Sequence, residues 1–314
     1  MTAEPKQSAR RGRRTLWAIA LFVTVVPLSL AAGALVMRAR AEAHKLVTNP
    51  IQTRHLPGRR PIDLGMVYDE LTATTADGLK LAGWYVPTEN GALVIAQHGY
   101  KADRGEMLNE AALLHQHGFG VLITSLRAHD LSSGDLITFG RNEMLDLEAW
   151  YRVAIAQEGV DANRIGILGN SLGGTLAIEF AAGTPGVKAV VANSAFSSLT
   201  DTLETSLRFF TGLPSFPFAP LITFFAEREA RIRVADVDAT RWIGRLSPRP
   251  VFLMQGGSDV VISRQSGQRL FDAAGEPREL WYEPKIAHSG FDNALPEEYE
   301  RRVVGFFTRY LLGP

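Results

Sequence analysis

The chain has 314 residues, with 33 basic and 33 acidic side chains, 46% hydrophobic residues and no cysteine. This apolar content excludes a disordered chain. The net charge of zero argues against a nucleic-acid partner, because such binders normally carry a basic excess. The lack of cysteine excludes disulfides, cysteine-based zinc sites, iron–sulfur clusters and a thiol nucleophile. The composition is that of an ordinary globular enzyme with one large domain or two small ones.

The N-terminus combines a basic cluster with a long uncharged segment. Residues 1–14 carry five lysines and arginines, and residues 15–37 carry no charge. As a helix, residues 15–37 would span about 35 Å, enough to cross a bilayer core of about 30 Å. We therefore predict a transmembrane anchor at 15–37. A cleaved signal peptide is the first alternative, although its apolar part is usually shorter, at about 7–15 residues. A buried helix of a soluble domain is the second.

The basic residues before the anchor predict its orientation. Positive flanks stay in the cytoplasm, so residues 1–14 are expected to form a cytoplasmic tail. The rest of the protein would then lie outside the cell membrane, held there by a single pass through the bilayer. Residues 38–63 contain three prolines and scattered charges, which is typical of a linker. A chain starting near Leu64 is accordingly expected to be soluble and active.

Residues 64–314 alternate between strand-like and helical segments. The expected strands are residues 68–75, 79–86, 92–97, 121–124, 165–169, 189–192, 251–255 and 280–282. The expected helices are residues 104–117, 142–158, 172–182, 265–274 and 296–312. This alternation, with continuous apolar runs in the strands, predicts an α/β domain whose mostly parallel central sheet has helices on both faces.

An insert at residues 195–249 interrupts the alternation. Between residues 209 and 225 it holds six phenylalanines, at positions 209, 210, 216, 218, 224 and 225. Ordinary helical packing would explain them, but inserts in such sheets often cover the ligand crevice. We expect a short helical lid in which Phe216, Phe218 or Phe224 faces the crevice and buries part of an acyl chain.

The sequence Gly169-Asn170-Ser171-Leu172-Gly173 fits the pattern G-x-S-x-G. An apolar strand precedes it and a helix-compatible segment follows. A sharp turn in this context places a serine hydroxyl on strained backbone at the end of the strand. Gly169 and Gly173 are required because side chains there would collide within the turn. The pattern predicts a nucleophile elbow with Ser171 as nucleophile.

Ser171 needs a base, and the base needs a carboxylate to orient it. In folds with this elbow the chain order is serine, acid, histidine. His288 is the only histidine after Ser171. Asp259 follows a predicted strand and a glycine turn, 29 residues before His288, and is the expected acid, with Glu283 in reserve.

The oxyanion of a tetrahedral intermediate needs backbone donors. One is expected from the amide of Leu172, directly after the nucleophile. The other is expected from the Tyr100 amide in the loop after the 92–97 strand, where Gly99 allows a close approach. His98 precedes the serine in the chain and is interpreted as a structural residue that joins neighbouring loops.

Together, His98-Gly99, the elbow, Asp259 and His288 resemble the α/β-hydrolase superfamily over residues 64–314. Within it the chain is most similar to bacterial hydrolases grouped with serine aminopeptidases, acyl-CoA thioesterases and membrane-anchored esterase-like proteins. Many of these carry Asp-x-Arg-Gly-His-Gly-x-Ser after the second core parallel strand. Residues 125–132 here read Ser-Leu-Arg-Ala-His-Asp-Leu-Ser, without the aspartate or the glycines. Substrate contacts from that loop are therefore not transferred.

The leading interpretation is a serine hydrolase that cleaves an ester, thioester or amide through an acyl-enzyme on Ser171. Its expected partners are a small-molecule acyl substrate and the lipid bilayer around the N-terminal helix. It needs no metal or organic cofactor. A non-catalytic binding or scaffold protein on the same fold is one alternative, and a transacylase that uses the same triad is another.

Overall fold

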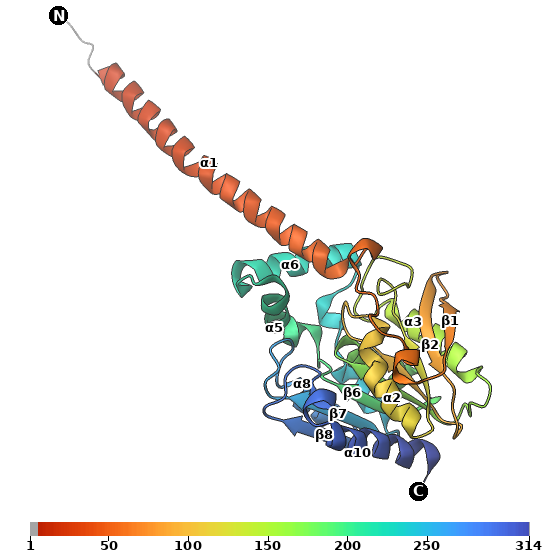
Figure 1. Ribbon diagram of the computed structural model, residues 1–314. Helices are drawn as coiled ribbons and strands as arrows, with labels where there is room; N and C mark the ends of the chain where they lie inside the picture. Colours follow the sequence, from red (N-terminus) through yellow and green to blue (C-terminus); the bar gives the residue numbers. More distant parts are fainter. Residues whose placement is uncertain (1–5, 314) are drawn as a thin grey trace, which may run out of the picture.

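The computed structural model describes residues 6–313 as one α/β domain with a long N-terminal helix (Figure 1). Its eight-stranded sheet has the order β1-β2-β4-β3-β5-β6-β7-β8. β2 is antiparallel to both β1 and β4, and every other pairing is parallel. The strands are β1 (Asp69–Thr74), β2 (Lys80–Val86), β3 (Leu93–Gln97), β4 (Gly120–Thr124), β5 (Ile165–Asn170), β6 (Val187–Asn193), β7 (Val251–Gly256) and β8 (Arg278–Glu283).

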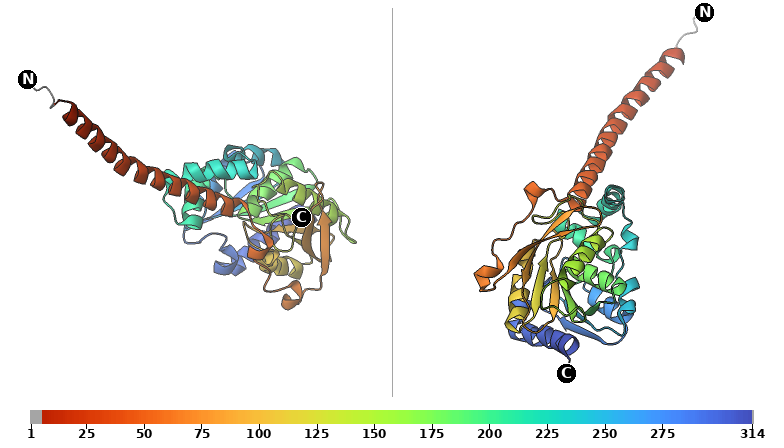
Figure 2. Two further views of the ribbon diagram at one scale, coloured as in Figure 1. Left: turned by 90° about the horizontal axis from the view of Figure 1, so that it is seen from above. Right: turned by 90° about the vertical axis from the view of Figure 1, so that its right-hand side faces the viewer.

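Helices cover both faces of this sheet (Figures 1 and 2). The α-helices are α1 (Lys6–Val47), α2 (Leu108–Gln116), α3 (Glu143–Ile155), α4 (Leu172–Gly183), α5 (Leu199–Thr211), α6 (Ser215–Ala230), α7 (Thr240–Ile243), α8 (Ser266–Ala273), α9 (Phe291–Ala294) and α10 (Pro296–Phe307). The shorter helical turns are η1 (Ile51–Thr53), η2 (Pro61–Leu64), η3 (Arg104–Met107), η4 (Val234–Asp236), η5 (Gly244–Leu246) and η6 (Thr308–Leu312). The expected α/β-hydrolase fold is thus confirmed.

Two apolar cores lie on opposite sides of the sheet. One joins the sheet to α3, α4 and α8, and the other joins it to α2 and α10. Every residue of β3, β4, β5 and β7 is buried. These strands read as continuous apolar runs because helices cover both of their faces. Because β3 to β8 run parallel to one another, their carboxyl ends lie at one edge of the sheet. The loops that carry the site emerge at this edge.

The predicted hairpin forms between β1 and β2. Thr74 pairs with Lys80, and Gly78 in the turn between them has φ +85°. That conformation strains any residue with a Cβ, so the glycine permits the tight reversal. The hairpin extends the parallel part of the sheet by two antiparallel strands at one edge.

Helix α1 is continuous over 42 residues. Within Leu16–Val47, an 18-residue stretch reaches a mean hydropathy of 2.4, so the helix is long and apolar enough to cross a membrane, as a signal sequence would also be. Residues 6–14 of the expected cytoplasmic tail belong to the same helix, and residues 1–5 lie outside the described part of the chain.

The structure differs from the expected linker at residues 38–63. The helix continues to Val47, and Ala39 and Ala43 are fully buried against α6. Beyond it, Asn49 donates from its side chain to the carbonyl of Ala128 at 2.8 Å, and Arg54 pairs with Asp135 at 2.9 Å. Residues 39–54 are therefore part of the packed domain. The prolines correctly indicate a segment without regular secondary structure. Such a segment can still be fixed to the domain by hydrogen bonds and ion pairs.

Candidate active site

Ser171 lies on the sharp turn between β5 and α4, with φ 52° and ψ −117°. This region is costly for a residue with a side chain, and such strain is typical of functional turns. The flanking glycines make the turn sterically feasible. A Cβ on Gly169 would lie 2.3 Å from the Gly173 backbone, and one on Gly173 would lie 2.4 Å from the carbonyl oxygen of Gln97. The local geometry is that of the expected nucleophile elbow.

His288 bridges the serine and an aspartate. Its Nε2 lies 2.8 Å from Ser171 Oγ, and its Nδ1 lies 2.7 Å from Asp259 Oδ2. The Asp259 side chain is fully buried, whereas that of His288 retains 19% exposure. The second carboxylate oxygen of Asp259 accepts the backbone N–H groups of Val261 and Ile262 at 2.8 and 3.0 Å. The aspartate is thus held in place and offers its free oxygen to the imidazole.

The loops after β7 and β8 are bonded to one another. The N–H groups of Gly257 and Ser258 donate to the carbonyls of Glu283 and Ile286 at 2.8 and 3.0 Å. This contact brings Asp259 to His288 across the 29 residues between them. Glu283, the reserve acid, instead accepts a hydrogen bond from Trp281 Nε1 at 3.0 Å. The imidazole contacts Asp259 and not Glu283.

The two residues whose amides are expected to bind an oxyanion line one pocket. Tyr100 and Leu172 line it together with Ser171. Within residues 6–313 neither backbone N–H has an acceptor, so both can donate to a ligand. A Cβ on Gly99 would lie only 3.3 Å from the Ser171 Cβ, which shows how closely the Tyr100 loop approaches Ser171. The Gly99 N–H donates to Glu106 at 2.6 Å and holds the loop there.

His98 and His129 are buried supports of this loop. His98 Nδ1 donates to the Gly99 carbonyl at 2.8 Å, and its Nε2 accepts from the Leu126 N–H at 3.2 Å. Burial lowers the pKa of His98 to about 4, so the ring is neutral at physiological pH. His129 Nε2 accepts from the Lys101 N–H at 2.9 Å. Both rings join loops and neither contacts Ser171.

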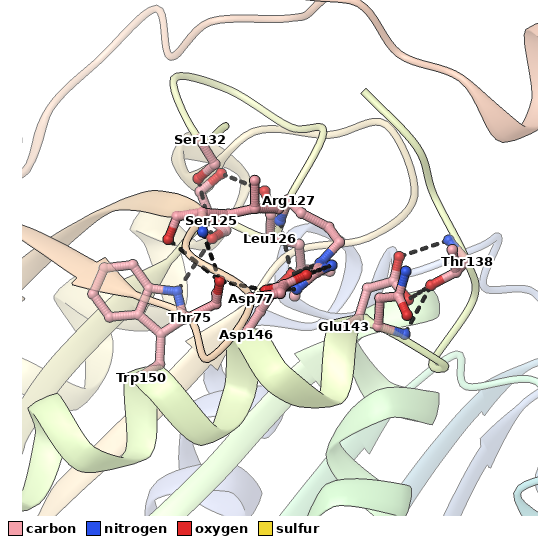
Figure 3. Close-up of polar contacts among 12 residues, drawn as sticks. Thr75, Asp77, Ser125, Leu126, Arg127, Ser132, Thr138, Glu143, Asp146 and Trp150 are labelled. Atoms are coloured by element: carbon pink, nitrogen blue, oxygen red, sulfur yellow. Dashed lines mark hydrogen bonds and ion pairs between the residues drawn. The ribbon is translucent and has the colours of Figure 1, made fainter. Parts of the chain in front are cut away.

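The loop at residues 125–132, which departs from the superfamily motif, is tied down by ion pairs. Arg127 lies between Asp77 of the β1–β2 turn and Asp146 of α3, at 2.9 and 2.7 Å (Figure 3). The Trp150 ring nitrogen also donates to the Ser125 carbonyl at 3.2 Å (Figure 3). Arg127, the arginine that matches the superfamily motif, therefore fixes the loop to the domain, and its guanidinium is occupied by these two carboxylates.

An apolar pocket of about 90 Å³ opens next to Ser171. Among the described residues that line it, none is charged. Helices α5 and α6 form one wall, through residues that include Leu203, Leu207, Phe210 and Ile222. The insert thus covers the crevice as a lid would. Leu46 and Val47 at the end of α1 complete the lining. No local pattern predicts this contribution, because nothing in the residues of a helix end shows where it will pack.

The expected phenylalanines were the wrong ones. Phe216, Phe218 and Phe224 do not line the pocket; of the six phenylalanines between residues 209 and 225, Phe210 does. Phe216 is 84% exposed and Phe224 46% exposed. Phe218 instead packs in the cluster that joins α1 to α5 and α6. The leucines and isoleucine of the two helices supply most of the apolar wall instead.

Comparison with known proteins assigns a family. A sequence profile of the prolyl oligopeptidase family matches residues 109–313, well over half of the chain. The chain belongs to the prolyl oligopeptidase family. Its match is therefore to a group of hydrolases within the α/β-hydrolase superfamily, as the fold and the elbow indicate.

The chain is also similar to proteins from bacteria and to a solved structure. Rv2307c of Mycobacterium tuberculosis is 29% identical over 239 residues, which cover 75% of each chain. YqkD of Bacillus subtilis is 26% identical over 237 residues, covering 74% of this chain and 76% of that one. The structure of the Pyrococcus furiosus esterase Pf2001 is similar with a TM-score of 0.72 and 26% identity, covering 85% of this chain and 98% of that one.

In this prolyl oligopeptidase family member, a chain of buried polar side chains lies beneath Ser171. Glu110 on α2 accepts from Asn170 Nδ2 at 3.0 Å, and Asn170 Oδ1 accepts from Asn193 Nδ2 at 3.1 Å. The Asn193 carbonyl in turn accepts the Ser171 N–H at 2.8 Å. These residues were not among the predicted site residues, although a polar side chain at the end of a buried strand is a signal that can be read from sequence. The chain fixes the backbone on which Ser171 sits.

The carboxyl group of Glu110 makes folding pH-dependent. Burial raises its pKa to about 8, so the folded state retains a proton that the unfolded state releases above its ordinary value of about 4.3. The contribution to stability is then lost progressively as the pH rises from about 5 to 8. We expect Glu110→Gln to stabilise the protein by a few kcal/mol at pH 9 and by little at pH 5. Thermal denaturation at the two pH values measures this, with exposed Glu89→Gln as control. Equal gains at both pH values would contradict it.

Proposed function

We propose that this protein is a membrane-tethered serine hydrolase that acts on acyl esters or thioesters through an acyl-enzyme. The observation that carries the proposal is the position of His288, within hydrogen-bond distance of both Ser171 and a buried aspartate. A serine, a base and an orienting carboxylate in this arrangement suit nucleophilic acyl transfer. The family match and the esterase neighbour support hydrolysis as the reaction class.

In the proposed mechanism Ser171 Oγ attacks the acyl carbon while His288 Nε2 takes its proton. The negative charge develops on the carbonyl oxygen, which accepts from the Tyr100 and Leu172 amides. His288 then protonates the leaving group, and the acyl-enzyme forms. A water gives a proton to His288 and attacks the ester, which regenerates Ser171 and releases an acid. Asp259 holds the Nδ1 proton of the imidazole throughout and stabilises its positive charge.

The pocket favours an apolar acyl group. The described residues that line it include no charged side chain that could bind a free amino terminus, so a peptide is the less favoured substrate despite the family's name. The alternative of a non-catalytic scaffold gains no support, since a binding pocket needs no aligned base and acid. A transacylase would use the same acyl-enzyme and differ only in the acceptor, so competition between water and added alcohols distinguishes the two.

Labelling with a serine-reactive fluorophosphonate tests the central claim. The protein should be modified at Ser171, and Ser171→Ala should abolish the label while a control change, Ser263→Ala in the loop after β7, leaves it intact. Peptide mapping by mass spectrometry locates the adduct. An unmodified wild-type protein that is folded by circular dichroism would support the scaffold alternative.

The apolar pocket predicts a preference for longer acyl chains. Each methylene that enters it contributes at most about 0.8 kcal/mol, so kcat/KM should rise by up to about fourfold per carbon from acetyl over a few carbons. Phe210→Ala should flatten this rise because its ring is part of the wall. The assay uses detergent-solubilised protein and p-nitrophenyl esters, with Phe216→Ala as the matched control outside the pocket. The same proportional loss for acetyl and longer esters would instead assign Phe210 to packing alone.

We also propose that α1 anchors the protein in the cell membrane, with the domain outside the cytoplasm. Its length and hydropathy support a span, and the basic residues in its first part, before the apolar stretch, support the orientation. The full chain should stay in the membrane fraction after carbonate washing, and its domain should be digested by protease added outside spheroplasts. Recovery of an intact full-length chain in the soluble fraction would contradict the anchor.

A further inference from the structure

The bend between α5 and α6 presents large apolar side chains to solvent. Phe216 is 84% exposed, Phe209 is 54% exposed and Phe224 is 46% exposed. We call these three residues the aromatic corner. The two helices meet at 101°, and together they are apolar enough to pass as a membrane-crossing segment. A soluble surface rarely gathers such side chains unless they contact a partner.

The aromatic corner adjoins the proposed anchor. Figures 1 and 2 show α6 beside the end of α1 and at the side of the domain from which α1 leaves. Ala39 and Ala43 of α1 and Ile222 of α6 are buried together, so α6 is fixed to the helix that would enter the bilayer. If α1 crosses a bilayer, α6 is therefore held close to the surface of that bilayer.

Two arginines lie where α1 meets α6. Arg40 of α1 and Arg228 of α6 line one groove, in which Glu229 is paired with His44. The Arg228 guanidinium lies 4.1 Å from the centre of the Phe224 ring. Aromatic rings beside arginines are typical of segments that lie at the boundary between lipid headgroups and acyl chains. The charges and rings thus match a lipid surface better than an apolar protein partner.

The aromatic corner is continuous with the mouth of the pocket. The Phe209 ring lies 5.1 Å from that of Phe210, and Phe210 lies 5.1 Å from the Tyr100 ring next to the nucleophile. Phe210 both lines the pocket and is 44% exposed, which places it at the opening. Leu46 at the end of α1 lines the same pocket.

We propose that the aromatic corner rests in the bilayer that α1 crosses, and that the pocket takes its acyl chain directly from a membrane-resident ester. This inference rests on the proposed hydrolase function and anchor, and it adds the substrate class. Phe209, Phe216 and Phe224 insert at the level of the headgroups, so that the opening at Phe210 faces the acyl chains. An amphiphile then reaches Ser171 without its apolar chain crossing water.

Depth measurements on the full chain test the docking. The chain has no cysteine, so Phe216→Cys gives a single site for an environment-sensitive nitrobenzoxadiazole fluorophore. The labelled protein is reconstituted in vesicles of phosphatidylcholine and phosphatidylglycerol, with lipid-borne nitroxide quenchers. The control, Glu297→Cys, lies on α10 at the opposite end of the domain from α1 (Figure 1). Strong quenching at 216 with little at 297 is expected. Equal quenching at the two sites overturns the proposal.

Activity on two substrates tests the route into the pocket. The double change Phe209→Ser and Phe216→Ser should lower hydrolysis of a long-chain monoacylglycerol in the same vesicles by about tenfold, because α1 still anchors the protein but the corner loses the apolar area that docks it on the bilayer. Hydrolysis of water-soluble p-nitrophenyl butyrate should stay within about twofold. Equal losses on both substrates, or none on the vesicle substrate, overturn the proposal. If the wild type hydrolyses neither ester, the hydrolase function fails, and the quenching still reports the docking separately.

Discussion

Ser171→Ala and His288→Ala should each remove nearly all turnover of any ester that the wild type cleaves. The serine supplies the nucleophile and the histidine moves its proton, so loss of either stops the same step. The double variant should therefore lose little more than each single one, because such residues act as a unit. Steady-state rates with a p-nitrophenyl ester, measured on protein that retains the wild-type melting temperature, give the comparison. Losses that multiply in the double variant would show that the two residues act independently.

Asp259→Asn should lower kcat by about 10⁴-fold, by analogy with the same change in serine proteases. The carboxylate oxygen that faces His288 Nδ1 is 2.7 Å away, and an amide there favours the wrong tautomer of the ring. Glu283→Gln is the matched control, because Glu283 contacts Trp281 and not the imidazole. A near-normal Asp259→Asn enzyme combined with an impaired Glu283→Gln enzyme would reassign the acid.

The sheet and the residues gathered at its edge were predictable because both depend on chain order. Buried strands that alternate with helices fix a mostly parallel sheet, and parallel strands bring their carboxyl ends to one edge. Ser171, Asp259 and His288 each follow a strand, so their meeting follows from the topology. The need for glycine at position 169 can also be predicted from sequence, because a Cβ there would collide with the backbone of Gly173 in the same motif.

The pocket was not predictable, because its walls come from elements whose packing no local pattern encodes. Six phenylalanines between residues 209 and 225 indicated a covering element, but the packing of α5 and α6 against the rest of the protein decides which of them face inward. Similarly, Ala39 and Ala43 are small residues among charged ones, which in sequence is typical of a linker or a cleavage site. Only their contact with α6, far away along the chain, makes them a packing face. The sequence of either segment alone does not indicate that the two segments will contact each other.

The residue at which a truncated chain begins should determine whether the protein without its predicted span folds and is active. The Tyr100 hydroxyl donates to the Leu46 carbonyl at 2.5 Å, and the Val47 carbonyl accepts the Ile137 N–H at 2.8 Å. The residue that offers the predicted oxyanion amide is thus held by the end of α1. A chain from residue 64 loses these bonds, worth about 1 kcal/mol each, together with one wall of the pocket.

We therefore expect a chain that starts at residue 38 to fold and hydrolyse p-nitrophenyl butyrate at close to the rate of the solubilised full chain. A chain that starts at residue 64 should lose most of its soluble yield, and any recovered protein should be at least about tenfold less active and melt several degrees lower. Both begin after the predicted span, so loss of the membrane is common to them and cannot explain a difference. Leu46→Asp within the longer chain distinguishes loss of the apolar pocket wall from loss of the hydrogen bonds. It places a charge in the pocket but keeps the backbone carbonyl that accepts from Tyr100. Equal activity of the two truncated chains would show that residues 38–63 are a dispensable linker after all.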